Sequence, residues 1–211
     1  MTIAVVGATG RTGREVVKQA LNRGHAVKAI ARRPDEIKIQ HGGLTLESAD
    51  VLDQDRVIAA LTGCDSVISA LGIGASRKPT VIYSQGVENE LVGMDKNGIG
   101  KIAVISAVPV GSKKGLPFMA RRVGIPILRT LFGPTYVDMR LMEDKLQVSQ
   151  VDWTVLRPGR LIAKHAKGEY RLDTDTLPSK GQSITCADLA TALLDAVDHD
   201  DLRRKIAYVA N

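Results

Sequence analysis

The fold of this chain is decided by one stretch near its start, Thr2-Ile3-Ala4-Val5-Val6-Gly7-Ala8-Thr9-Gly10-Arg11-Thr12-Gly13. Residues 2–6 form an apolar, β-prone run, and three glycines spaced three apart follow it. Helical apolar spacing then runs through Leu21 and stops at Gly24. A strand, a glycine turn and a helix in this order predict the first βαβ unit of a dinucleotide-binding sheet. The glycines admit a tight turn and let a pyrophosphate approach the helix N-terminus.

Short β-prone runs continue to alternate with amphipathic helical runs along the chain. Further strands are predicted at residues 26–31, 44–48, 66–70, 101–106, 153–157 and 206–209. Helices are predicted from Asp53 or Asp55 to Gly63, over 79–97, over 136–149, and over 187–197 behind the capping residue Thr185. The pattern predicts an α/β fold, namely a Rossmann-type doubly wound parallel sheet with a small substrate-side excursion in its C-terminal half.

One domain over residues 1–211 accounts for all of these elements. Two substrate-side loops are expected, at about 107–135 and about 160–184. Residues 107–118 are rich in Gly, Pro and Lys, and residues 167–184 have the pattern of a hairpin-like excursion. These segments would shape the substrate pocket, but their sequences do not name a substrate.

Composition sets the class of protein. Hydrophobic residues make up 44% and charged residues 25%, which is the balance of a globular protein and excludes disorder. The apolar runs are far shorter than the roughly 20 residues of a membrane helix, so no membrane partner is expected. No signal peptide is recognisable, and Cys64 and Cys186 resemble reduced thiols, so a cytoplasmic protein is expected. A monomer or a weak homodimer fits these observations.

The net charge of +6 is unevenly placed. There is no acid between Lys96 and Val137, whereas the basic residues there are Lys96, Lys101, Lys113, Lys114, Arg121, Arg122 and Arg129. Such a stretch either attracts a small anionic partner or is a solvated loop. Nucleic acid is not expected, because aromatic residues are only 3% of the chain. No metal site is expected either, because the four histidines are far apart and lack ligand spacing.

The end of the second strand predicts which dinucleotide binds. An NAD site usually has Asp or Glu there to hold the ribose 2′-hydroxyl, whereas a 2′-phosphate favours Arg. The sequence reads Ala31-Arg32-Arg33-Pro34, and Asp35 comes only after the proline. Arg32 can hold a phosphate through its planar guanidinium, and Arg33 can stack on adenine or add charge. The predicted cofactor is therefore NADP, bound by the turn of Gly7, Ala8, Thr9, Gly10, Arg11, Thr12 and Gly13 together with Arg32 and Arg33.

A Tyr-x-x-x-Lys pair, which many dehydrogenases use for proton transfer to a carbonyl oxygen, is absent. Tyr83 is followed at that spacing by Val87, and Tyr170 by Thr174. Tyr136 is followed by Arg140, which is the nearest imitation. The absence favours an acceptor that delocalises the incoming hydride over alcohol and ketone exchange.

Several short motifs in order make the whole chain resemble the atypical short-chain dehydrogenase/reductase superfamily. The motifs are Gly7–Gly13, Arg32-Arg33, Ala49-Asp50-Val51, Ala70-Leu71-Gly72, Leu156-Arg157-Pro158-Gly159, Ile184-Thr185 and Asp188-Leu189-Ala190. The chain is most similar to the NAD(P)H-binding group that holds biliverdin IXβ reductase/flavin reductase and NmrA-like proteins. Each motif is unspecific alone, whereas their order and spacing are fairly specific.

The resemblance implies roles for individual residues. Asp50 and Val51 would lie along the adenine, and Ala70, Leu71 and Gly72 along the middle of the cofactor. Ser106 would lie near the nicotinamide, as would Pro158 and Gly159. A histidine of the biliverdin reductase group is replaced by Arg160, which either holds an anionic group of the substrate or faces solvent. The candidate catalytic residues are therefore Ser106, Arg160 and Tyr136.

These observations predict an NADPH-dependent reductase that passes hydride to a flat conjugated acceptor, such as a flavin, a quinone or a tetrapyrrole-like compound. Ser106 would polarise or position the acceptor, and the acceptor would be a small, anionic molecule under the basic 113–129 loop. The alternative is an NmrA-like redox sensor that binds NADP(H) without turnover. An epimerase-type relative is disfavoured by the missing Tyr-x-x-x-Lys pair.

Overall fold

The computed structural model describes residues 1–74, 76–111, 116–179 and 181–211. One sheet dominates it, with the strand order β3-β2-β1-β4-β5-β6-β10-β8. The strands are β1 Thr2–Val6, β2 Ala26–Ala31, β3 Leu44–Ser48, β4 Ser66–Ser69, β5 Lys101–Ile105, β6 Asp152–Pro158, β8 Arg171–Asp173 and β10 Lys205–Ala210. All neighbours pair in parallel except β8, which pairs antiparallel with β10. The predicted Rossmann-type sheet is thereby confirmed.

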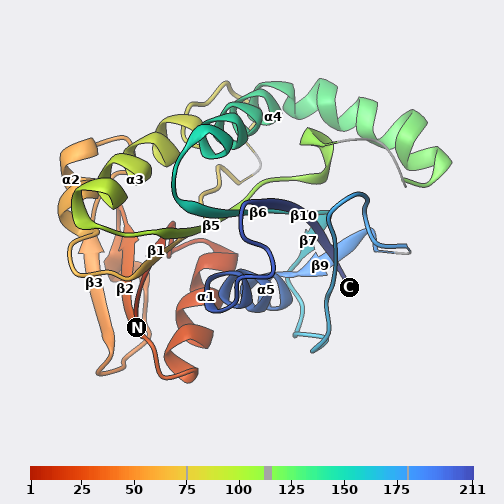
Figure 1. Cartoon of the computed structure of the whole chain (residues 1–211). Helices are drawn as coiled ribbons and strands as arrows, with labels where there is room; N and C mark the ends of the chain where they lie inside the picture. Colours follow the sequence, from red (N-terminus) through yellow and green to blue (C-terminus); the bar gives the residue numbers. More distant parts are fainter. Residues whose placement is uncertain (75, 112–115, 180) are drawn as a thin grey trace.

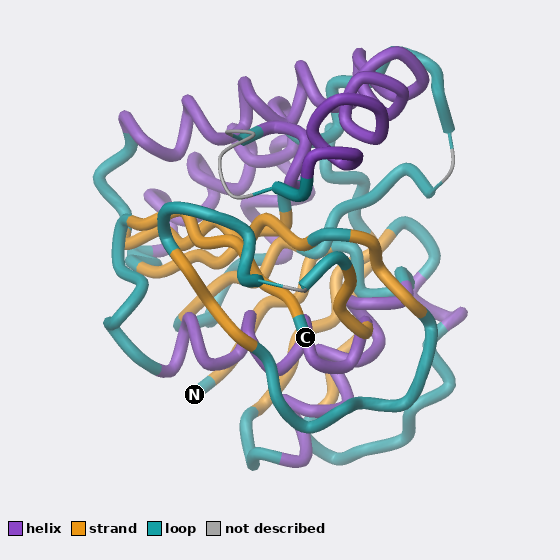
Figure 2. Tube along the Cα trace, turned by 90° about the vertical axis from the view of Figure 1, so that its right-hand side faces the viewer, coloured by secondary structure: helices purple, strands orange, loops and turns teal. Residues whose placement is uncertain are grey.

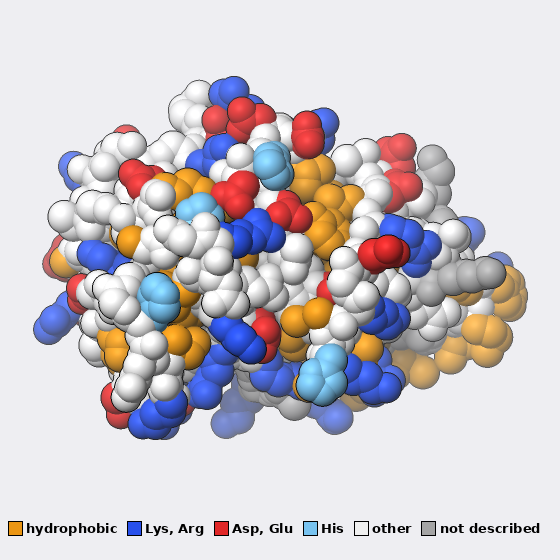
Figure 3. Space-filling model, turned by 90° about the horizontal axis from the view of Figure 1, so that it is seen from below, with side chains coloured by type: hydrophobic (Ala, Val, Ile, Leu, Met, Phe, Trp, Pro, Cys, Tyr) orange, Lys and Arg blue, Asp and Glu red, His pale blue; other side chains and the backbone are white. Residues whose placement is uncertain are grey.

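Helices cover both faces of the sheet (Figure 1; Figure 2 shows the same layers from the side). Helices α1 Arg11–Asn22 and α5 Cys186–Asp198 pack together on one face. Helices α2 Gln54–Ala60, α3 Ser84–Asn97 and α4 Ile125–Val148 cover the other. Seen from below, the face with α1 and α5 carries interspersed positive and negative side chains (Figure 3).

Strand β1 shows how the sequence builds two cores. Successive side chains of a strand point to opposite faces. Ile3 and Val5 therefore join the core beneath α1 and α5, and Ala4 and Val6 join the core beneath α2, α3 and α4. Both faces of this strand are buried, which explains why its sequence is apolar without alternation.

Helix starts follow their capping chemistry. Asp53 caps α2, because its Oδ1 accepts the Arg56 N–H at 3.1 Å. Thr185 caps α5, because its Oγ1 accepts the Asp188 N–H at 2.9 Å. Helix α3 was predicted from residue 79 but begins at Ser84. Asp138 of α4 caps it there by accepting the N–H groups of Tyr83 and Ser84 at 2.9 and 3.2 Å, and a partner from a distant helix leaves no local signal.

Two predicted loop segments are wrong in detail. The segment 107–135 is largely helical: a 3-10 turn spans Val108–Val110, a π-helix spans Ala120–Gly124, and α4 begins at Ile125 instead of residue 136. Prolines misled the prediction. Pro126 lies in the first turn, where a missing N–H costs nothing, and Pro134 is absorbed by a kink at Phe132 (φ −127°, ψ 21°).

The segment 167–184 does not form a hairpin. Its strand β8 pairs with β10, and its strand β9 Ser183–Thr185 pairs in parallel with β7 Arg160–Ile162 as a second, two-stranded sheet. Strand β10 supplies the hydrogen-bonding groups to the edge strand β8 that a local hairpin would have supplied. Partners that distant in the sequence do not show in a local turn pattern.

The carboxyl group of Glu90 on α3 is fully buried and faces β4 of the sheet. Its Oε1 accepts the Ser69 hydroxyl at 2.9 Å, whereas its Oε2 has no protein partner among the described residues. Burial raises the pKa of Glu90 from 4.5 to about 8, against the smaller opposing effect of the Ser69 hydrogen bond. The group is therefore protonated in the folded protein at neutral pH.

We predict that Glu90→Gln removes a pH dependence of stability. In the unfolded chain this carboxyl ionises near pH 4.5, whereas the folded one ionises near pH 8. The folded state therefore binds more protons between these values, and this group's contribution to the unfolding free energy falls as the pH rises. As the pH rises through this window, the unfolding free energy of the variant should increase relative to that of the wild type by about 1.4 kcal/mol per pH unit. Urea unfolding measures both free energies. Glu88→Gln, at a partly exposed position of the same helix, is the control, and an equal shift in both variants would contradict the prediction.

Candidate functional site

The glycine turn brings three backbone segments together between β1 and β4. Gly7 has φ +76°, and a Cβ there would lie 2.7 Å from the Ala70 carbonyl oxygen. A Cβ on Gly13 would overlap the Gly7 carbonyl oxygen and stand 2.9 Å from the Ala8 Cα. The Gly7 N–H also donates to the Ile30 carbonyl oxygen at 3.0 Å, which ties the turn to β2. Only glycine fits Gly7 and Gly13 without moving backbone.

Helix α1 begins at this turn with a residue that has no side chain to cap it, Gly10. The first N–H groups of any helix lack partners inside the helix, and its N-terminus carries a partial positive charge. No acidic residue stands in the first turn of α1. The turn therefore presents free N–H donors and positive potential at the carboxyl end of β1, which suits a phosphate group.

A cleft of about 850 Å³ opens along the carboxyl ends of the parallel strands. Its position next to the β1/β4 boundary is the point where the strand order reverses. Among the predicted residues, the structure brings the following to its lining: Gly7, Thr9, Gly10, Arg11, Thr12, Arg32, Arg33, Asp50, Val51, Ala70, Leu71, Gly72, Ser106, Pro158 and Gly159. Two predicted residues are not in the lining. Ala8 is buried in the core, and Gly13 packs against Gly7, so these two support the turn from behind.

One end of the cleft carries charges that sequence reasoning missed. Glu36 lines it and pairs with Arg33, with the Arg33 Nε 3.1 Å from Glu36 Oε1. Arg14 stands 3.9 Å from the same carboxylate. Arg33 is 76% exposed in its side chain, so the pair is held weakly. Glu36 ends a short 3-10 turn that begins at Pro34, and an acid five residues beyond the end of β2 was the available signal.

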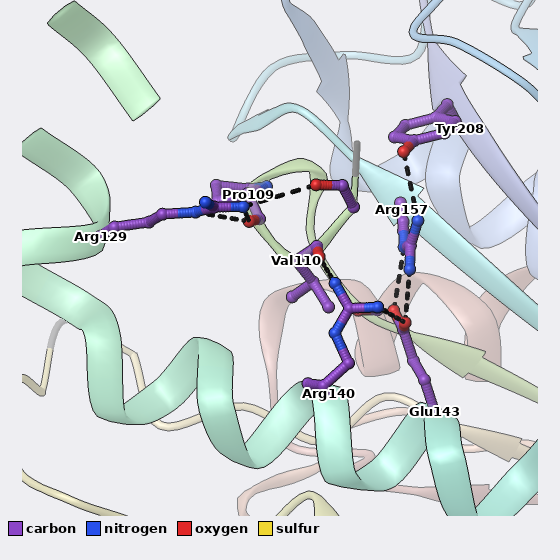
Figure 4. A network of polar contacts seen from close by, with 9 residues as sticks. Pro109, Val110, Arg129, Arg140, Glu143, Arg157 and Tyr208 are labelled. Atoms are coloured by element: carbon purple, nitrogen blue, oxygen red, sulfur yellow. Dashed lines mark hydrogen bonds and ion pairs between the residues drawn. The ribbon is translucent and has the colours of Figure 1, made fainter. Parts of the chain in front are cut away.

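The other end is built on a buried polar network (Figure 4). Ser106 donates its hydroxyl hydrogen to Glu143 Oε1 at 2.6 Å. Arg157 of β6 donates to both carboxylate oxygens of Glu143 and, at 3.2 Å, to the Tyr208 hydroxyl oxygen of β10. Glu143 is 0% exposed, so its charge depends on these donors. Ser106 lines the cleft, and with its hydrogen directed to Glu143 it presents lone pairs to other groups.

Tyr136 lines the cleft, but Arg140 does not act on it as the lysine of a Tyr-x-x-x-Lys pair would. Arg140 donates to the Val110 carbonyl oxygen, and its Nη1 stands 3.9 Å from Glu143 Oε2 (Figure 4). Burial raises the pKa of Tyr136. A raised pKa is the opposite of the activation that proton transfer from a tyrosine needs at neutral pH.

Arg160 lies at the rim of the cleft on an exposed strand. Its backbone N–H donates to the Gln182 carbonyl oxygen at 2.9 Å, which begins the pairing of β7 with β9. The preceding Gly159 is also required there, since a Cβ would lie 2.5 Å from the same carbonyl oxygen. Arg160 is thus positioned at the cleft by its backbone, and its side chain is exposed.

Thr135 and Met139 of α4 also line the cleft. The Thr135 Oγ1 atom is buried and has no hydrogen-bond partner in the described part of the chain. A helical threonine commonly bonds the carbonyl four residues earlier, as Thr130 does with Pro126 at 3.1 Å. The kink at Phe132 interrupts this pattern. The sequence predicted the helix only from residue 136, but alignment on Glu143 and Leu146 had already set Thr135 and Met139 at the positions of the tyrosine and lysine of a Tyr-x-x-x-Lys pair.

The described residues of the basic stretch lie in different surroundings. Lys101 pairs at 2.8 Å with Asp200, at the amino end of β5 and therefore at the sheet edge opposite the cleft. Arg129 donates to the Pro109 carbonyl oxygen at 2.8 Å through Nη2 (Figure 4). Arg121 and Arg122 are exposed on the π-helix. Lys113 and Lys114 lie outside the described residues.

The described part of the chain lacks two further features. No group of three or more His, Cys, Asp or Glu side chains there is arranged to hold a metal ion. No helix there combines the length and the hydropathy that crossing a bilayer requires.

The cleft has the size of a dinucleotide site, and at Gly7 and Gly13 a Cβ would meet neighbouring backbone, so the turn beside the cleft stays free of side chains there. The model of a family described as NAD(P)H-binding matches residues 7–200. The chain belongs to the NAD(P)H-binding family. The expected resemblance to an NAD(P)H-binding group is confirmed.

Individual relatives cover most of the chain. It is 31% identical over 216 residues to an uncharacterized chloroplastic protein of Arabidopsis thaliana, covering 98% of this chain and 75% of that protein. It is 24% identical over 217 residues to the photosystem II assembly factor Ycf39 of Synechocystis, covering 97% of this chain and 61% of Ycf39. The solved structure of ChuY, an anaerobilin reductase from Escherichia coli, has a TM-score of 0.81 at 22% identity, covering 100% of this chain and 97% of ChuY.

We predict that Gly13→Ala impairs both folding and nucleotide binding. The added methyl group would meet the backbone of Gly7 and Ala8, which cannot give way as a flexible side chain can. We expect a loss of about 1–3 kcal/mol in unfolding free energy, measured by urea unfolding, and weaker NADP(H) binding, measured by nucleotide fluorescence. Gly100→Ala is the matched control, because nothing lies within 4 Å of a Cβ there. Equal behaviour of the two variants would contradict the close approach at Gly13.

Proposed function

We propose that the protein is an NADPH-dependent reductase that passes hydride to a flat conjugated acceptor, such as a flavin, a quinone or a tetrapyrrole-like compound. The observation that carries this proposal is the acceptor end of the cleft, where both predicted hydroxyl groups are unsuited to donate a proton. NADPH supplies the hydride when bound. The residues of this chain would hold the two reactants and exclude water.

Support for NADPH over NADH comes from the two arginines after β2. Arg33 already contacts Glu36, so we assign the 2′-phosphate to Arg32, whose exposed side chain also lines the cleft. A guanidinium and a phosphate match in shape and charge. Glu36 would reduce the preference for NADPH over NADH, because its carboxylate can accept a hydrogen bond from the 2′-hydroxyl of NADH.

Support for a conjugated acceptor comes from Ser106 and Tyr136. The Ser106 hydroxyl hydrogen is committed to Glu143, and burial raises the pKa of Tyr136. Ketone reduction creates an alkoxide that needs a nearby acid. A flavin, a quinone or a tetrapyrrole spreads the incoming charge over its ring system, so it depends more on a shaped pocket than on a proton donor.

A sensor that binds NADP(H) without turnover is the second candidate. The same acceptor end favours it, since a protein that only reports the cofactor's redox state needs no proton donor. The photosystem II assembly factor among the relatives carries a name that describes no reaction. Multiple turnovers distinguish the two candidates.

We predict multiple-turnover oxidation of NADPH with FMN, a quinone or a tetrapyrrole as acceptor. The loss of NADPH absorbance measures this oxidation. Arg32→Ala should raise the KM for NADPH roughly tenfold or more and leave the KM for NADH nearly unchanged, because only NADPH has the 2′-phosphate. Arg56→Ala, an exposed arginine of α2 outside the cleft, is the control. Tight NADP(H) binding without turnover on any acceptor would reject the reductase and support the sensor.

We predict that Tyr136→Phe lowers kcat by less than about threefold, whereas the loss of a general acid typically costs about a hundredfold or more. The expectation follows from the raised pKa of Tyr136 and from the contact of Arg140 with Val110. Steady-state kinetics with the best acceptor measure it. A hundredfold loss of kcat with an unchanged KM would identify Tyr136 as the proton donor.

A further inference from the structure

The segment before and within the first turns of α4 exposes large apolar side chains. Phe118 is 71% exposed and Met119 65% exposed. Val123, Ile127 and Leu128 are 44%, 52% and 36% exposed. The segment that carries these residues projects beyond the sheet at the right in Figure 1, and hydrophobic side chains are visible at the right-hand edge from below (Figure 3).

Three of these residues share one face of a helical segment. Met119, Val123 and Ile127 are four residues apart along a helical segment, so they form an apolar stripe on one face of it. Ile125, by contrast, is buried in a cluster with Val108 and Tyr208. Ile125 therefore holds the segment on the body of the protein while the apolar stripe stays in solvent. A surface helix normally turns its apolar face to the core.

Exposed arginines lie beside the apolar stripe. Arg121 and Arg122 are exposed there, and the Arg122 guanidinium stands 5.8 Å from the centre of the Phe118 ring. The sequence has no acid from residue 96 to residue 137. This segment therefore combines exposed apolar area with positive charge, and a partner that offers an apolar region bordered by anions would match it.

We propose that this surface docks on an anionic lipid bilayer. The helical segment would lie in the plane of the interface, with the apolar stripe at the acyl boundary and Arg121 and Arg122 among the phosphate headgroups. An interfacial helix needs no membrane-spanning run, so the short apolar runs that led the sequence analysis to expect no membrane do not bear on it.

A second copy of the chain fits this surface less well. A twofold contact through the apolar stripe would bring Arg121 and Arg122 near the same residues of the other copy. Like charges across an interface oppose association, and the neighbouring sequence holds no acid to compensate them. An anionic lipid surface instead pairs with every one of these charges.

Vesicle flotation of the full-length protein tests the proposal. Vesicles of phosphatidylcholine alone are compared with an equal mixture of phosphatidylcholine and phosphatidylglycerol. We expect binding to the mixture that weakens with added salt, and a Val123→Asp/Ile127→Asp double variant that binds at least about tenfold more weakly because two apolar contacts are lost. Val148→Asp adds a charge at the other end of α4, at a residue 80% exposed, and should bind as the wild type does.

Circular dichroism and thermal unfolding of each variant exclude misfolding as the cause. Failure of the wild type to bind the anionic vesicles at low salt would overturn the proposal, as would equal losses with Val148→Asp and with the double variant. A dimer in solution that the double variant dissociates would overturn it too, because the apolar stripe would then be an interface between copies. The test does not depend on turnover, so it stands or falls separately from the proposed reductase.

Discussion

The close approach of three backbone segments at the glycine turn is the constraint on which the site depends. Gly7 stands against the carbonyl of Ala70, Gly13 against Gly7, and the Gly7 N–H bonds to Ile30. Because no side chain intervenes, β1, β2 and β4 end at one edge and the N-terminus of α1 opens onto it. The cleft, the donors for a phosphate and the arginines after β2 all take their places from this contact. A Cβ at Gly13 would meet the backbone of Gly7 and Ala8 and would push α1 away from the end of β1.

The opposite end of the cleft depends on a different interaction, the buried pair of Glu143 and Arg157. It joins α4 to β6, and through Ser106 and Tyr208 it also reaches β5 and β10. Removing one partner would leave a buried charge without compensation, which is costly in a low-dielectric interior. The pair therefore fixes the elements around this end of the cleft, and its carboxylate also accepts the Ser106 hydroxyl hydrogen. One contact thus holds this end rigid and sets the orientation of the Ser106 hydroxyl.

The two ends of α4 differ in what they contact. Its later turns are buried through Met142 and Leu146 and supply Glu143 to the network. Its start is held by Ile125 and by the bonds of Arg129 to the Pro109 carbonyl, while the apolar stripe is exposed. One helix thus serves as a wall of the cleft and as an outer surface. The kink at Phe132 lies between these two parts and coincides with the cleft-lining residues Thr135 and Tyr136.

The sequence by itself determined the order of strands and helices, the glycine turn and the two arginines beside it, because these features depend on local spacing and on residues near in the chain. Fifteen of the seventeen cofactor candidates line the cleft, whereas Ala8 and Gly13 stand behind the turn, because spacing does not say which side of a turn faces the cleft. Only the tertiary structure decided the start of α3, the helical form of residues 120–135 and the pairing of β8 and β9. Asp138 caps α3 from another helix, Ile125 packs in one cluster with Tyr208, and β8 pairs with β10, so each of these contacts joins residues far apart in the sequence. The same distance hid the commitment of Ser106 to Glu143, since a hydrogen bond between residues 37 positions apart is made by folding and leaves no local pattern.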